Sequence, residues 1–102
     1  YSIFALLFTI LISTPAAAED YVLTIKDNQF SPKDLIVPAN QKVKITVKNE
    51  DSTPEEFESS DLSREKVVSG NSQINMLVGP LKPGTYKYEG EFHKGTGTIT
   101  AK

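Results

Sequence analysis

The chain has 102 residues, enough for one small domain, and its 11 Lys and Arg nearly balance its 13 Asp and Glu. This balance provides no basic surface for a phosphate backbone, so no nucleic-acid partner is expected. The sequence contains no cysteine and one histidine. Disulfide frameworks, thiolate metal centres and cysteine nucleophiles are therefore excluded.

The first segment of the chain predicts export. Residues 2–12 read SIFALLFTILI, and Pro15 and the Ala16-Ala17-Ala18 triplet follow them. A short apolar run that ends in small residues is typical of a secretory signal peptide, and it is too short to span a bilayer. We expect residues 1–18 to be a signal peptide, truncated at its start, and residues 19–102 to be one periplasmic domain.

The clearest strand signal lies at residues 42–48, where Val43, Ile45 and Val47 alternate with Lys or Thr. A period of two with β-branched residues on one face is typical of a half-buried strand. Weaker versions of this pattern predict further strands at 21–26, 35–37, 56–59, 66–68, 73–78, 85–89 and 98–101. Seven or eight short strands, with no long amphipathic helix, predict an all-β fold, either an antiparallel sandwich or a barrel.

The apolar side of these strands predicts the hydrophobic core. The expected core residues are Val22 or Leu23, Ile25, Phe30, Leu35, Val37, Val43, Ile45, Val47, Phe57, Val67, Ile74, Leu77, Leu81, Tyr86, Tyr88 and Ile99. Met76 lies within an apolar strand, and we interpret it as a core residue as well.

The sequence has no phosphate-binding glycine loop and no H-E-x-x-H or G-x-S-x-G pattern, so hydrolytic catalysis is not expected. Carboxylates are instead concentrated in residues 50–65, which hold seven of the 13 Asp and Glu. Glu56 and Glu58 would project from one face of a strand, with Phe57 pointing to the core between them. Because close like charges repel, carboxylates that converge in space are stabilised by a cation.

A second polar group lies at Glu89, Glu91 and His93, again at alternate positions. Carboxylates with one imidazole suit iron, manganese, zinc or Cu(II) better than Cu(I). Two other interpretations stay open: the acidic stretch is a solvated loop, and the lone histidine is a surface or packed residue.

The order of the elements resembles the cupredoxin-like family over residues 21–102. The matching pieces are Asn28–Pro32, Leu35–Asn40, Asn49–Asp51, Gly79–Tyr86, Phe92-His93 and Gly97–Ile99. The resemblance implies a Greek-key β-sandwich of seven to eight strands. It places Glu55 or Glu56 where the family has its first copper histidine, and Gly90 where it has the thiolate, while His93 is retained. A blue-copper centre needs two histidines and a thiolate, so no type-1 copper is expected.

Three segments, Glu56–Glu58, Arg64–Lys66 and Pro80–Tyr86, are similar to EfeO-type periplasmic iron-uptake proteins and to small subunits associated with Ftr1-type iron permeases. This resemblance implies that the protein binds an iron or copper ion and hands it to such a permease or to another uptake subunit. The metal ligands expected on this basis are Glu56, Glu58, Glu65, Glu91 and His93, with Glu55 in place of Glu56 if the strand register slips by one. Oxidation of Fe(II) would also need a redox partner and an electron acceptor.

A competing hypothesis is that the sandwich has lost its metal and docks on a permease or oxidase subunit through its acidic face. Convergence of three or more of the side chains of Glu56, Glu58, Glu91 and His93 would favour a metal site. Ligands splayed more than about 8 Å apart would favour the interaction module, because metal–ligand distances are about 2.0–2.6 Å.

Overall fold

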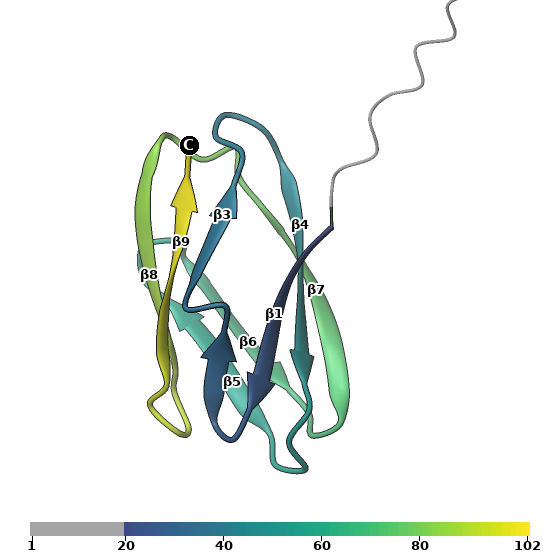
Figure 1. Ribbon diagram of the computed structural model, residues 1–102. Coiled ribbons are helices and arrows are strands. Elements are labelled where there is room, and N and C mark those ends of the chain that lie inside the picture. Colours follow the sequence, from purple (N-terminus) through teal and green to yellow (C-terminus); the bar gives the residue numbers. More distant parts are fainter. Residues whose placement is uncertain (1–19) are drawn as a thin grey trace, which may run out of the picture.

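The computed structural model describes residues 20–102, which form two layers of β-strands (Figure 1). The strands are β1 (Asp20–Lys26), β2 (Gln29–Ser31), β3 (Asp34–Val37), β4 (Val43–Asn49), β5 (Glu55–Ser59), β6 (Arg64–Val68), β7 (Ser72–Val78), β8 (Gly84–Gly90) and β9 (Thr96–Ala101). Within this part of the chain no helix is long and apolar enough to cross a membrane. The predicted signal peptide, residues 1–18, lies outside the described residues.

The strands form one sheet in the order β2-β1-β4-β7 and a second in the order β3-β9-β8-β5-β6. The predicted all-β sandwich is confirmed, but the strands are not antiparallel throughout, because β1 pairs with β4 and β3 with β9 in parallel. The predicted number of strands is too low because β2 is short. Asp27 and Asn28, both with positive φ, make the two-residue turn that joins it to β1.

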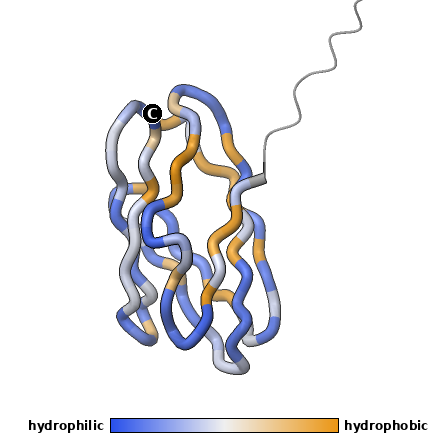
Figure 2. The backbone as a smooth tube through the Cα atoms, viewed as in Figure 1, coloured by the Kyte–Doolittle hydropathy of each residue, from blue (hydrophilic) through white to orange (hydrophobic). Residues whose placement is uncertain are grey.

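The core between the sheets contains most of the residues expected there, but one expected core residue in each of two strands is exposed. In β6, Val68 is buried and Val67 is 54% exposed. In β7, Met76 and Val78 are buried and Leu77 is 64% exposed. Consecutive apolar residues do not define which side of a strand faces inward, so these two predictions were wrong. Figure 2 shows the apolar segments running through the strands and the mostly hydrophilic turns between them.

Three aromatic rings form the centre of the core near the candidate ligands. Phe30 and Tyr88 have ring centroids 5.0 Å apart, and Phe57 lies 4.9 Å from Tyr88. On β1, Leu23 is buried and Val22 is exposed, which decides between the two predicted core residues. Because Phe57 and Tyr88 point inward, the residues on either side of each of them must point outward.

The turns at 27–28, the loop 50–54 and the loop 91–95 lie at the end of the sandwich opposite the C-terminus (Figure 1). The Asp51 carboxylate accepts hydrogen bonds from the backbone N–H groups of Asn28 and Asp27, each at 2.9 Å. These two hydrogen bonds hold the pKa of Asp51 below its usual value, and the bond from Asn28 has the larger effect. The buried Asn49 side chain donates to the carbonyl oxygens of Thr53 and Val68. This network fixes the loop that leads into β5.

Candidate metal centre

The three glutamates of strand β5 lie on two different sides of the sheet. Its residues alternate between buried and half-buried, with Glu55, Phe57 and Ser59 inside and Glu56 and Glu58 outside. Glu55 is therefore directed into the sandwich, while Glu56 and Glu58 lie on the outer face of the five-stranded sheet, as the alternation predicts.

The outer face brings three carboxylates together. Glu58 is paired in register with Glu89 of the neighbouring strand β8, and Glu91 follows one residue after that strand ends. One carboxylate oxygen from each of Glu58, Glu89 and Glu91 lies within 4.8 Å of the other two. We call these three residues the carboxylate cluster. Glu58 and Glu91 are predicted ligands, and Glu89 joins them because β5 pairs with β8.

Two carboxyl groups of the cluster have pKa values shifted in opposite directions. A hydrogen bond with Glu91, then the negative charge of Glu91, raises the pKa of Glu58 to about 7. The same hydrogen bond, then the positive charge of Lys94, lowers the pKa of Glu91. The Lys94 ammonium lies 3.6 Å from the Glu91 carboxylate. These shifts favour a proton on Glu58 that is donated to Glu91, and a cation at the cluster would compete with this proton.

Two further predicted ligands lie beside the cluster on the same face. Glu65 of β6 is paired in register with Glu58. A hydrogen bond with Glu65, together with burial and nearby negative charges, raises the pKa of Glu56. Adjacent strands β6, β5 and β8 therefore carry a continuous row of carboxylates.

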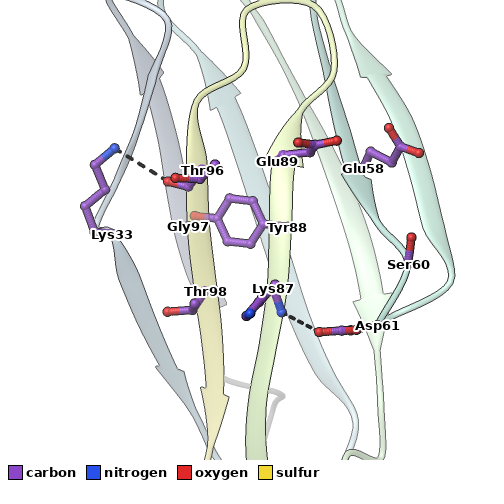
Figure 3. A pocket seen from close by; sticks show the side chains of 10 residues that line it. All are labelled: Lys33, Glu58, Ser60, Asp61, Lys87, Tyr88, Glu89, Thr96, Gly97 and Thr98. Atoms are coloured by element: carbon purple, nitrogen blue, oxygen red, sulfur yellow. Dashed lines mark hydrogen bonds between the residues drawn. The ribbon is translucent and has the colours of Figure 1, made fainter.

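A groove of about 580 Å³ runs over the outer face from the cluster toward β9 and Lys33, the residue before β3. Glu58 and Glu89 lie at one end of this groove, and Figure 3 shows the Glu89 carboxylate extending toward Glu58. Lys87 also lines the groove, and Lys33 lies on its opposite side (Figure 3). The sequence did not predict this groove because its walls come from three strands, β5, β8 and β9, and from the loops beside them, whose order is visible only in the folded sheet.

His93 does not join the carboxylate cluster. Strand β8 ends at Gly90, so the alternation that links Glu89 and Glu91 does not continue to His93. The His93 imidazole turns to the inner side of β5, where its Nδ1 lies 2.9 Å from Oε2 of Glu55. The predicted ligands therefore separate into an outer acidic group and an inner Glu55–His93 pair.

The chain matches the model of the cupredoxin-like domain over residues 2–101. It belongs to the cupredoxin-like domain family. This cupredoxin-like chain is also 47% identical over 74 residues to an uncharacterized protein of Rickettsia prowazekii (strain Madrid E). The match covers 72% of this chain, which spans only 59% of the length of that relative.

Solved structures of other cupredoxins share the fold. Amicyanin from Paracoccus versutus gives a TM-score of 0.66 at 14% identity, over 88% of this chain and 86% of amicyanin. A purple cupredoxin from Nitrosopumilus maritimus gives a TM-score of 0.64 at 22% identity, over 81% of this chain and 100% of the purple cupredoxin. Reduced auracyanin from Roseiflexus castenholzii gives a TM-score of 0.66 at 14% identity, over 84% of this chain and 99% of auracyanin. At these identities the likeness shows the fold alone.

One of the similar structures is an amicyanin mutant in its Cu(I) form, so the fold can hold copper in that protein. The residues of this cupredoxin-like chain do not fit a type-1 copper centre, because the sequence has no cysteine to supply the thiolate. Gly90, at the position that the resemblance gives to the thiolate, packs against a carboxylate: a Cβ on it would lie 2.7 Å from Cδ of Glu55. We therefore assign no blue-copper electron transfer to this chain.

Proposed function

We propose that this cupredoxin-like chain is an exported protein that binds a hard metal ion, with iron as its cargo, at the carboxylate cluster. The observation that carries the proposal is the convergence of Glu58, Glu89 and Glu91. Three carboxylates at this separation repel one another unless a proton or a cation lies among them. A single proton bridges two of them, whereas a divalent or trivalent cation attracts all three.

The donor set supports the choice of ion. Carboxylate oxygens suit hard cations such as Fe(II), Fe(III) and Mn(II) and disfavour Cu(I). Glu56 and Glu65 on the same face offer further oxygen ligands. All three side chains of the cluster are half-buried, which leaves the ion open to water and to exchange. Such a site suits the carriage and release of an ion better than permanent structural binding.

The proposed place of action follows from the first 18 residues and from the resemblance to iron-uptake proteins. A signal peptide would send the domain to the periplasm, where it would meet incoming iron. Its partner would be an Ftr1-type iron permease or another periplasmic uptake subunit. The proposed role is binding and delivery of the ion, and it assigns no catalytic group.

Calorimetric titration of the purified protein with Mn(II), and with Fe(II) under anaerobic conditions, tests this proposal. We expect one saturable site, and at least about tenfold weaker binding in the Glu58→Gln, Glu91→Gln double variant, which keeps the shape of both side chains and removes their charge. Glu50→Gln is the matched control, because Glu50 is an exposed acid of the nearby loop outside the cluster.

Absence of saturable binding at micromolar metal would contradict the proposal and favour the interaction module that docks on a membrane protein. Equal affinity in the double variant and in the wild type would place the ion elsewhere. Equal weakening by Glu50→Gln would mean that general surface charge attracts the ion, with no defined site.

A further inference from the structure

We propose that the Glu55 carboxylate ties the end of the sandwich together at the place that the resemblance gives to the family's copper ligands, and that position 90 is glycine to leave room for it. The inference is independent of the carboxylate cluster, because Glu55 lies on the opposite side of β5. It makes Glu55 and His93 a side-chain lock between β5 and the loop 91–95, and it leaves the inner site closed to a metal.

Glu55 is buried as deeply as the core residues, with an exposed fraction of 1%. A buried carboxylate is stable only when its oxygens are hydrogen-bonded or paired with a charge. Here Oε1 accepts the backbone N–H of Glu56 at 2.8 Å and that of Phe92 at 2.9 Å. Oε2 lies 2.9 Å from Nδ1 of His93. Both oxygens therefore have partners, and two of the three partners belong to the loop after β8.

Gly90 provides the room in which this carboxylate lies. A Cβ at position 90 would lie 2.7 Å from Cδ and 2.8 Å from Oε2 of Glu55. A free surface glutamate would swing aside at little cost. The Glu55 carboxylate cannot do so without losing its hydrogen bonds to Phe92 and His93 inside the protein. The glycine and the glutamate are thus a matched pair.

His93 closes the site from the outside. In the proposed lock the Nδ1–H of His93 donates a hydrogen bond to Oε2 of Glu55, and this tautomer is part of the proposal. The ring is 30% exposed while its partner is 1% exposed, so the imidazole covers the carboxylate. Backbone bonds from Gly90 N–H to Gly95 oxygen and from Lys94 N–H to Gly90 oxygen complete the loop. Three hydrogen bonds occupy most of the lone-pair positions of this carboxylate, which leaves little coordination capacity for a cation.

A double-mutant cycle with a glycine control tests the lock. Gly90→Ala should lower the melting temperature by several degrees in the wild type, and by much less in a Glu55→Ala background, where the carboxylate that the new methyl group meets is gone. Gly97→Ala is the control, because a Cβ at Gly97 would meet the Tyr88 ring instead. It should lower the melting temperature equally in both backgrounds. An equal loss for Gly90→Ala in both backgrounds would overturn the proposal.

If Glu55→Ala does not fold, measurements on the wild-type protein decide the matter. We expect slow hydrogen exchange of the Phe92 amide and imidazole ¹⁵N shifts of the tautomer protonated at Nδ1 for His93. Fast exchange of this amide, or the tautomer protonated at Nε2, would overturn the lock. Conversely, failure of Glu55→Ala to fold together with both expected signals supports it. Metal titration of the wild type tests the cluster separately, so the two proposals can fail independently.

Discussion

Glu58 is the residue of the outer face whose ionisation depends most on its neighbours. Its pKa is raised to about 7, first by the hydrogen bond to Glu91 and then by the charge of Glu91. A raised pKa means that the folded protein holds this proton more tightly than the unfolded chain does. The resulting stabilisation is fully present below about pH 4.5, the ordinary value for this side chain, and it is lost as the pH rises through about 7.

Glu58→Gln should therefore be more stable than the metal-free wild type at pH 8 and about equally stable at pH 5. Glutamine cannot lose a proton, so it retains a donor to Glu91 and adds no repulsion. Urea unfolding in the presence of a chelator at both pH values measures the difference. A variant that is less stable than the wild type at pH 8 would contradict the shared-proton arrangement.

Adding Mn(II) at pH 8 should make the wild type more stable than Glu58→Gln. The wild type should gain stability with increasing metal concentration, because the ion binds the folded state alone, whereas Glu58→Gln should gain much less. The same urea titration with the chelator replaced by Mn(II) tests this. An equal gain of stability in the two proteins would mean that Glu58 does not bind the ion.

At the level of secondary structure, most strands could be predicted from the alternation of apolar and polar residues. Strand β4 shows why: Val43, Ile45 and Val47 face the core and polar side chains separate them. Val67 of β6 and Leu77 of β7 were wrongly predicted to be buried, because Val67 and Val68 are adjacent and Leu77 lies next to Met76. In such runs the paired strand decides which residue faces inward.

Alanine substitutions at two neighbouring positions of β7 check this register. Met76→Ala should lower the free energy of unfolding by about 2–5 kcal/mol, because it leaves a cavity in the core. Leu77→Ala should change it by less than about 0.5 kcal/mol, because Leu77 is a surface residue. Chemical denaturation of both variants distinguishes the two registers. A loss for Leu77→Ala as large as that for Met76→Ala would show that Leu77 is a core residue, as the sequence predicted.

At the level of the whole molecule, the sheet order determines which of the predicted ligands meet. Glu58 and Glu91 are far apart in the sequence, and they come together only because β5 lies next to β8. Glu89 could have been included, since it shares a face with Glu91 on the same strand pattern. The separation of His93 could not be predicted, because it depends on where β8 ends and on the buried position of Glu55.

On both proposals, a cation binds the outer carboxylate cluster while the Glu55–His93 pair keeps the inner site closed. Anomalous X-ray diffraction from crystals soaked in Mn(II) tests both halves at once. We expect one strong anomalous peak about 2.0–2.6 Å from carboxylate oxygens of Glu58, Glu89 and Glu91, with the Glu55–His93 contact intact. A peak at His93 and Glu55, or no peak at the cluster at saturating Mn(II), would contradict it.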